Sequence, residues 1–247
     1  MKTKIVFGLM AGLAMLFNAC SESATDVVDE EILASEEVKS SEVTVLLGDS
    51  CDFSAELSDA EIEGLLLMRE EEKFAHDVYV TFYEVYGIPV FNNISKGETA
   101  HTSAMLHLIE GFGLEDPYVE GIGNYSNPAF TELFAQLTEQ GSAGLVEALK
   151  VGAFIEEYDI ADLEELIEST EDATIKRVYG NLLRGSTFHM KAFTAVLNSM
   201  GESYTPTVIS QEEYDEILEG NVNDDDGDSN GTFVPGTGEC NGTGPNA

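Results

Sequence analysis

The sequence predicts an all-α protein: a four-helix bundle with one long connection between its second and third helices, flanked by disordered acidic tails. Three observations carry this prediction. Apolar residues recur at helical spacing through four long segments between residues 58 and 200. Helix-start and helix-stop residues bound these segments, and no stretch has the apolar–polar alternation of a β-strand. The connections are short, then long, then short, as two helical hairpins joined by a crossover require.

The first two predicted helices form a hairpin. Ser58-Asp-Ala-Glu61 is a capping-box sequence, and the apolar pattern behind it continues to Tyr86, where Gly87 ends the helix. After a turn at Ile88-Pro89, a second helix is predicted over about residues 90–112. Because the connection is so short, the two helices are expected to be antiparallel neighbours.

The rest of the helical region supplies the crossover and the second hairpin. A long stretch contains a short helix that begins at Asn127-Pro128, where proline suits the first helical position. Long helices are then predicted over residues 142–167 and 171–200, with a tight acidic turn between them. A weaker helical segment follows at residues 210–218. Two hairpins joined by one long crossover form the ferritin-like arrangement of a four-helix bundle.

The N-terminus predicts export and lipid attachment. Residues 1–19 have the basic head and the short apolar run of a signal peptide, and Leu16-Phe-Asn-Ala-Cys20 resembles a bacterial lipobox. That resemblance implies cleavage before Cys20 and attachment of fatty acyl chains such as palmitate, which would anchor the protein to a membrane of the cell envelope, expected to be the outer membrane. The alternative is ordinary secretion, with Cys20 lost in the cleaved peptide.

Composition divides the chain and limits its partners. After the signal peptide we expect an acidic tether over residues 20–54, the bundle over 55–201 and a mostly disordered acidic, glycine-rich tail over 202–247. The chain has 47 acidic and 11 basic residues, a net charge of −36, which repels polyanions. Nucleic acid is therefore excluded as a partner, and membrane contact is expected through the lipid anchor only. Assembly into a homo-oligomer is left open.

Two features of the flanking segments have alternative interpretations. Cys51 and Cys240 lie on either side of the bundle, and in an oxidising compartment they can form a disulfide or both stay free. The tail sequence that starts at Asp226 matches the first half of a calcium-binding loop. Thr237 stands where the closing glutamate of such a loop is expected.

Polar residues interrupt the apolar stripes of the helices. Glu98 and His101 share one face of the second helix, Glu156 and Asp159 one face of the third, and His189 lies in the stripe of the fourth. Burying such groups is costly unless something binds them. Carboxylates and imidazoles together favour a transition metal such as iron or zinc over calcium. A hydrogen-bonded Glu98–His101 pair without metal is the alternative.

The segments that carry these residues resemble rubrerythrin-like and ferritin-like proteins. Glu72-Lys-Phe-Ala-His-Asp-Val-Tyr79 is similar to their first helix, Glu98-Thr-Ala-His101 to the Glu-x-x-His of their second, and Glu156-Glu-Tyr-Asp159 to the Glu-x-x-Glu pair of the rubrerythrin third. The wider sequence over about residues 56–201 resembles an uncharacterised family of ferritin-like domains found in bacteria and archaea.

The resemblance implies a set of ligands for iron, as a di-iron or a mononuclear centre: Glu72, Glu98, His101, Glu156, Asp159 and His189. It makes Glu98 a bridge between two ions, gives each ion one imidazole, and makes Glu72 and Glu156 terminal or bridging ligands. One position departs from the pattern. Ser186 stands where the last helix of related di-iron proteins has the glutamate of a second Glu-x-x-His. This leaves Glu72, Glu98 and Glu156 unless Asp159 substitutes, so an altered dinuclear centre, a mononuclear centre and a relic of a site are the alternatives.

Two classes of function follow. The first is a metal-binding protein for iron sequestration, ferrous oxidation, or reduction of oxygen or peroxide. The sequence has no Cys-x-x-Cys pair and therefore lacks the rubredoxin-type electron-transfer module of rubrerythrins, which weakens the peroxidase interpretation. The second is a non-catalytic helical binding or scaffold module of the cell envelope with a degenerate metal site.

Several polar residues near these ligands are predicted to be ordinary surface or core groups. Glu70, Glu71 and Glu157 lie off the apolar stripes and are expected to face solvent, as are His76 and His107. Tyr79 and Tyr83 are expected to be core aromatics rather than radical or proton-relay groups.

Overall fold

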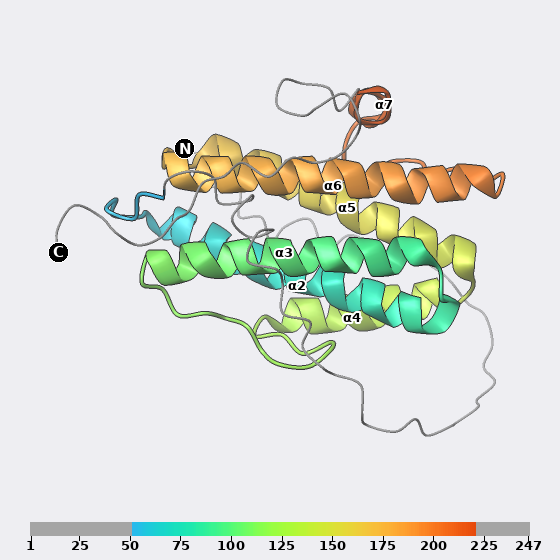
Figure 1. The fold of residues 1–247 in the computed structure, drawn as a ribbon, viewed down its shortest axis with the longest axis horizontal. Coiled ribbons are helices and arrows are strands. Elements are labelled where there is room, and N and C mark those ends of the chain that lie inside the picture. Colours follow the sequence, from blue (N-terminus) through green and yellow to red (C-terminus); the bar gives the residue numbers. More distant parts are fainter. Residues whose placement is uncertain (1–50, 221–247) are drawn as a thin grey trace. The chain divides into compact units, whose positions relative to one another are not determined.

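The computed structural model describes residues 51–220 of the chain. These residues form six α-helices and, within that range, no β-strand. Two helices are short, α4 Pro128–Gly141 and α7 Gln211–Glu219 (Figure 1). The other four are long: α2 Asp59–Tyr86, α3 Pro89–Gly111, α5 Leu145–Ser169 and α6 Ala173–Ser199. The prediction of an all-α bundle with one long connection between its second and third long helices is confirmed.

Several predictions concern residues outside this range. They are the signal peptide over residues 1–19, lipid attachment at Cys20, the calcium-loop sequence from Asp226, and the disulfide between Cys51 and Cys240, of which only Cys51 is described. All of them stay predictions. Among residues 51–220, none of the helices combines the length and the apolarity that a membrane crossing requires.

The ends of the first hairpin follow from the predicted capping residues. The Ser58 hydroxyl accepts a hydrogen bond from the backbone N–H of Glu61, whose carboxylate accepts the Ser58 N–H at 2.8 Å, which completes a capping box. Gly87 ends α2 in the left-handed conformation, at φ 65°, which a residue with a Cβ rarely adopts. α3 starts at Pro89, where the missing N–H of proline would have had no partner in the helix.

α5 begins at Leu145 rather than at Ser142, where the sequence analysis placed its start. Ser142 belongs instead to the end of α4, where its hydroxyl donates to the carbonyl oxygen of Glu139 at 2.6 Å. A serine between two helices can cap either one, and the residue type alone does not decide which.

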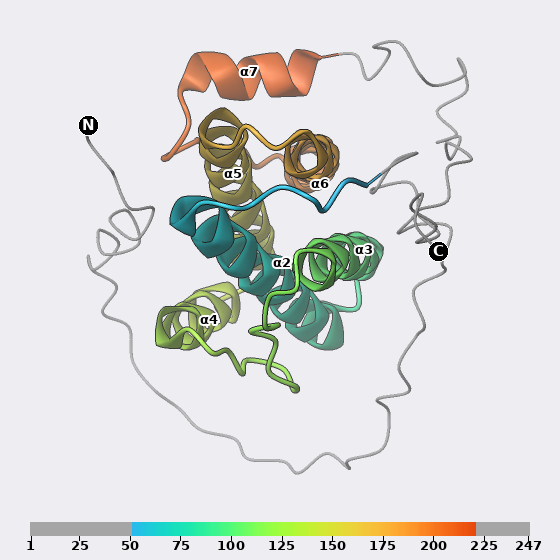
Figure 2. The same cartoon turned by 90° about the vertical axis from the view of Figure 1, so that its left-hand side faces the viewer.

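The two hairpins pack on each other as two layers. α2 and α3 form one layer and α5 and α6 the other, and α2 meets α5 while α3 meets α6 (Figure 2). The connection between α3 and α5 carries α4, which lies against α2 and α5. This crossover returns the chain to the opposite end of the bundle, so that α3 and α5 run in the same direction (Figure 1).

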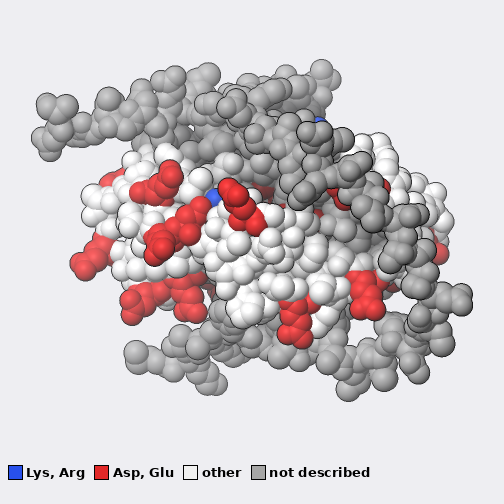
Figure 3. Space-filling view, turned by 90° about the horizontal axis from the view of Figure 1, so that it is seen from below, with Lys and Arg blue, Asp and Glu red and all other residues white. Residues whose placement is uncertain are grey.

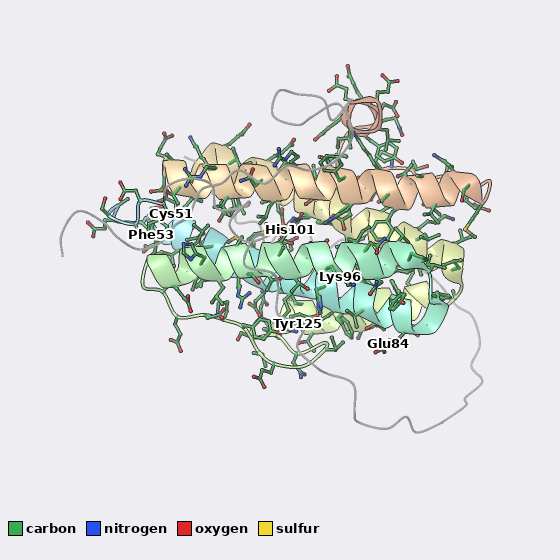
Figure 4. All side chains as sticks on the ribbon, in the orientation of Figure 1. Cys51, Phe53, Glu84, Lys96, His101 and Tyr125 are labelled. Atoms are coloured by element: carbon green, nitrogen blue, oxygen red, sulfur yellow. The ribbon has the colours of Figure 1, made fainter. Side chains whose placement is uncertain are left out.

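An ion pair and several hydrogen bonds fix the crossover to the outer face of α2. The Arg69 guanidinium lies 3.0 Å from each carboxylate oxygen of Asp116 and donates to the carbonyl oxygen of Thr102 at 2.6 Å. One turn further on, Lys73 pairs with Asp77, whose carboxylate also accepts the Tyr125 hydroxyl at 3.0 Å. Figure 4 labels Tyr125 below α3, in the region of α2 and α4. The half-buried Arg69–Asp116 pair and the hydrogen bond from Tyr125 to the buried Asp77 therefore hold the crossover against α2.

The chain that follows α6 covers the outer face of the second hairpin. Glu157 of α5 is fully buried, and its carboxylate accepts the three successive backbone N–H groups at residues 207–209 and the hydroxyl of Tyr204. α7 then packs on α6, where the Tyr214 and Thr194 hydroxyls lie 3.1 Å apart. Residues 202–220 thus cover the bundle, although they lie in the segment that was predicted to be a mostly disordered tail. Within them α7 confirms the weaker helix that was predicted at residues 210–218.

Three acidic residues that were predicted to face solvent are buried, so this prediction was wrong. The exposed fractions of Glu70, Glu71 and Glu157 are 6%, 4% and 0%. Glu157 lies beneath the segment after α6, and Glu70 accepts the backbone N–H of Asn127 in the crossover at 2.9 Å. Helical periodicity places these residues outside the four-helix core correctly, but it does not reveal that other segments cover them.

Acidic side chains dominate the charged surface. Figure 3 shows Asp and Glu side chains spread over the face in view, with very few Lys or Arg among them. This agrees with the net charge of −36 on which the sequence analysis excluded nucleic acid.

Candidate metal centre

The polar residues of the core lie near the middle of each long helix. On one side of them the core consists of aromatic rings, chiefly Tyr79, Phe82, Phe91 and Phe193. On the other side aliphatic and methionine side chains form a larger cluster: Leu65, Met68, Met105, Leu108, Leu163, Ile175, Val178 and Leu182. The predicted ligands therefore occupy one polar layer between two apolar blocks, where unpaired charges are costly.

Two groups of three residues converge in this layer. Glu72, Glu98 and His101 form one, and Glu98, Glu156 and His189 form the other, with the potential ligand atoms of each group within 4.8 Å of one another. Glu98 belongs to both. The structure thus brings five of the predicted residues into two adjacent sets that share one carboxylate.

Distances within the layer show how Glu98 joins the two sets. His101 Nδ1 lies 2.9 Å from Glu98 Oε2 and 3.1 Å from Glu72 Oε2. His189 Nδ1 lies 2.9 Å from Glu98 Oε1 and 3.4 Å from Glu156 Oε2. Each carboxylate oxygen of Glu98 therefore faces a different imidazole, and each imidazole turns its Nδ1 atom toward two carboxylates. Figure 4 shows His101 in the space between α3 and α6.

Hydrogen bonding does not satisfy all of these atoms. Within residues 51–220, four buried atoms of the layer have no hydrogen-bond partner: Glu72 Oε1, Glu98 Oε1, Asp159 Oδ1 and His189 Nδ1. The contact between His189 Nδ1 and Glu98 Oε1 is short but is not aligned as a hydrogen bond. Buried polar atoms nearly always have partners, so four such atoms in one layer fit donors arranged around a cation.

The pKa values of the histidines reflect the surrounding acids. Burial lowers the pKa of His101, but Glu72 and Glu98 outweigh this and raise it well above its ordinary value. For His189 burial is likewise outweighed, and Glu98 with Glu156 raises its pKa to about 10. Burial acts to raise the pKa of Glu98, yet the two imidazoles hold it below its usual range.

The other carboxyl groups are harder to ionise. Burial, together with the charge of Asp159, raises the pKa of Glu72 well above its ordinary value. Burial and the charge of Glu98 raise the pKa of Glu156 to about 7, and burial and Glu156 raise that of Asp159 to about 8. Crowded buried acids of this kind are stabilised by protons or by metal cations, and both of these neutralise the same negative charge.

Two glycines make room for the imidazole rings. A Cβ atom on Gly185 of α6 would lie 2.4 Å from His101 Nε2, and one on Gly97 of α3 would lie 2.7 Å from His189 Nε2. The Nε2 side of each ring thus abuts a glycine of the opposite helix, and its Nδ1 side faces the carboxylates. The sequence analysis missed these two residues.

A short internal repeat is the signal that could have identified them. Lys96-Gly-Glu-Thr-Ala-His101 and Arg184-Gly-Ser-Thr-Phe-His189 share a basic residue, a glycine, a threonine and a histidine at the same spacing. In this repeat Gly97 corresponds to Gly185 and Glu98 to Ser186. The two hairpins therefore present one motif each to the polar layer, and they differ at the carboxylate position.

Asp159 and Tyr79 lie at the edge of the two sets. Asp159 belongs to neither of them, although it is buried on the same face of α5 as Glu156 and accepts a hydrogen bond from Ser186. Tyr79 is fully buried in the aromatic block, as predicted, and its hydroxyl donates to Glu156 Oε1. Tyr83, which was also predicted to be a core aromatic, is 39% exposed, because Phe82 takes the core position.

Three further groups near the layer belong to neither set of potential ligands. His76 contacts Asp77, with Nδ1 3.0 Å from Oδ1, and is partly exposed. His107 lies one and a half turns beyond His101 and packs its ring against Phe53, with ring centroids 5.5 Å apart. Glu71 faces Asp162 of α5, and burial together with that charge raises its pKa well above the ordinary value. No local pattern distinguishes Glu71 from a surface glutamate.

The fold and the site define a class: an all-α bundle with a buried cluster of glutamates and histidines that could bind metal. Within this class the chain belongs to the family described as "Uncharacterized protein domain (DUF2202)", whose model matches residues 61–221. The predicted relation to an uncharacterised family with archaeal members is therefore confirmed.

An archaeal relative is similar in both sequence and structure. The uncharacterized protein MJ0754 of Methanocaldococcus jannaschii is 49% identical over 163 residues, which make up 66% of this chain and 88% of the relative. The crystal structure of the hypothetical protein MJ0754 from Methanococcus jannaschii DSM 2661 matches with a TM-score of 0.67 and 47% identity, over 68% of this chain and 97% of that chain. Neither description names an activity.

Proposed function

We propose that this protein is a lipid-anchored cell-envelope protein whose ferritin-like bundle binds two transition-metal ions, with iron the ion that fits best. The observation that supports the proposal is the position of the Glu98 carboxylate. Its two carboxylate oxygens face two imidazoles, each 2.9 Å away, and it belongs to both converging groups of potential ligands. A shared carboxylate between two such groups is the arrangement that a pair of metal ions requires.

Charge balance supports two ions rather than one. Glu72, Glu98, Glu156 and Asp159 supply four negative charges when ionised, and two divalent cations neutralise them. The donor atoms are carboxylate oxygens and imidazole nitrogens, which suit iron and manganese as well as zinc and do not favour calcium.

In this proposal Glu72, Glu98 and His101 would hold one ion, and Glu98, Glu156 and His189 would hold the other. Bound iron would supply one-electron redox chemistry toward oxygen or peroxide, or serve as stored metal. The residues around it bind and orient: Tyr79 holds one oxygen of Glu156, and the two glycines hold the Nε2 edges of the imidazoles in place. The apolar blocks on both sides exclude water from the layer.

Metal analysis of the purified protein tests the proposal. Protein from iron-supplemented cells is expected to carry close to two transition-metal ions per chain. At a free metal concentration about 100 times Kd, binding stabilises the fold by about 2.7 kcal/mol, which raises Tm by roughly 5–10 °C in a domain of this size. The Glu98→Gln variant should lose both the metal and this rise.

A matched control lies on the same helix. Glu110 is exposed near the end of α3, and Glu110→Gln should keep the metal content and the Tm rise of the wild type. If the wild type carries far less than one metal ion per chain, and Glu98→Gln melts as the wild type does with and without metal, the metal site is degenerate. The non-catalytic scaffold function then takes its place.

Envelope anchoring rests on the N-terminal sequence and needs a test of its own. Cells fed labelled palmitate should incorporate the label into the wild type and not into Cys20→Ala. Equal labelling of the two proteins, or labelling of neither, would remove the lipid anchor from the proposal without affecting the metal site.

A further inference from the structure

A buried serine occupies the place where the internal repeat lacks a carboxylate. Ser186 corresponds to Glu98 in the repeat and is fully buried in the polar layer. Its hydroxyl donates to Oδ2 of Asp159 and lies 3.0 Å from the carbonyl oxygen of Leu182 one turn earlier. A hydroxyl carries one proton, so the bond to Asp159 leaves none for Leu182, and this bond ties the carboxylate of α5 to α6.

The second oxygen of Asp159 is available to a ligand. Asp159 is only 5% exposed, and its Oδ1 atom has no hydrogen-bond partner among residues 51–220. Asp159 follows Glu156 by three residues on the same face of α5, and it interacts electrostatically with Glu98 and His101. It therefore lies beside both converging groups with one oxygen held and one oxygen unpartnered.

Side-chain length explains why the pair can replace one glutamate. A glutamate at residue 186 would place its carboxylate two methylenes from the backbone of α6. Serine ends after one, which leaves space in the layer that a carboxylate from the neighbouring helix can fill. The aspartate on α5 contacts the serine on the neighbouring helix α6 within the same hairpin, and the serine hydroxyl orients its carboxylate.

We propose that Asp159 is the fourth carboxylate ligand of the metal centre and that Ser186 is its positioning residue, so that the two together replace the glutamate missing from the second repeat. This inference rests on the proposed function. Ser186 orients the carboxylate through Oδ2, and the unpartnered Oδ1 is the oxygen that Asp159 would offer to an ion.

Titration with Co²⁺ in a calorimeter tests this assignment, because it counts sites without depending on activity. The wild type should show two sites. Ser186→Ala should weaken the site that Asp159 serves by about 10–100-fold, the usual effect of removing a group that orients a ligand. Asp159→Asn should weaken it further, to the point of losing that site. Thr187→Ala is the matched control, because it removes a hydroxyl from the adjacent residue. The Thr187 hydroxyl donates to the carbonyl oxygen of Arg184 and points away from the layer.

A double variant separates a missing ligand from a damaged fold. Asp159→Ala with Ser186→Glu moves the carboxylate from α5 to α6 and should restore two sites to within about tenfold of the wild type. If Asp159→Asn does not fold, Ser186→Ala and the double variant still decide the question. Two Co²⁺ sites of unchanged affinity in Ser186→Ala and Asp159→Asn would overturn this assignment and leave the proposed function intact. No Co²⁺ bound by the wild type would overturn both.

Discussion

Replacing Gly185 with alanine adds one methyl group against the imidazole of His101. The new Cβ atom would lie 2.4 Å from His101 Nε2, about 1 Å closer than an ordinary contact between such atoms. Forcing an extra methyl group into a packed core costs about 1–3 kcal/mol. The same change gains about 0.8–1.0 kcal/mol, because alanine favours a helix interior over glycine.

Gly180 supplies the control on the same helix. A Cβ atom there meets nothing within 4 Å, so Gly180→Ala should show only the gain in helix propensity. The two variants should therefore differ by about 1–3 kcal/mol in the free energy of unfolding, or roughly 2–12 °C in the Tm of the metal-free proteins. Circular dichroism during urea and thermal unfolding measures this difference.

Metal affinity gives the second measurement on the same pair. A displaced His101 should weaken Co²⁺ binding by about 10–100-fold in Gly185→Ala, whereas Gly180→Ala should bind as the wild type does. If Gly185→Ala is stabilised as much as Gly180→Ala and binds Co²⁺ with wild-type affinity, His101 is not held against α6 and the described geometry of the centre is wrong.

Two further predictions concern the covers of the bundle. Asp77→Asn leaves the buried Lys73 ammonium without its counter-charge and should lower the free energy of unfolding in urea by about 3–5 kcal/mol. A decrease under about 1 kcal/mol would mean that Lys73 reaches solvent. Burial opposes ionisation of Asp77, but His76, Lys73 and the Gly123 N–H lower its pKa, so the folded state holds fewer protons than the unfolded one. The contribution of Asp77 to the free energy of unfolding should be complete above its unfolded pKa of about 3.9. It should be lost as the pH falls through the lower folded pKa, and this loss should be missing in Asp77→Asn. Glu157→Ala should speed hydrogen exchange of the backbone amides at residues 207–209 and lower the free energy of unfolding by about 1–3 kcal/mol. Unchanged amide protection there would show that other contacts hold the segment.

The helices were predictable where local chemistry determines them. The capping box at Ser58, the left-handed Gly87 and the proline at the start of α3 act within a few residues, so the sequence alone places the first hairpin correctly. Ser142 shows the limit of this argument, because a serine between two helices offers its hydroxyl to either of them.

The buried surface of the bundle was predictable only in part. Apolar spacing identifies the faces that meet between the four long helices, but burial of Glu70 and Glu157 depends on segments that are distant in the sequence. Asn127 covers the first and residues 207–209 cover the second. Neither contact leaves a periodic signal on the helix that it covers.

The centre was predictable in its ligand types and not in its arrangement. Glu98 and His101 stand out because they interrupt an apolar stripe, and the same holds for His189. That Glu98 faces both imidazoles depends on the packing of α3 against α6, which no local spacing contains. The roles of Gly97 and Gly185 become clear only when the imidazole beside each of them is known.

Anomalous diffraction at the iron edge, from crystals grown with Fe²⁺, locates bound iron in the protein. Two iron peaks are expected on either side of the Glu98 carboxylate, one beside Nδ1 of His101 and one beside Nδ1 of His189. Anomalous density absent from this layer, or bound elsewhere on the acidic surface, would contradict the proposed metal centre.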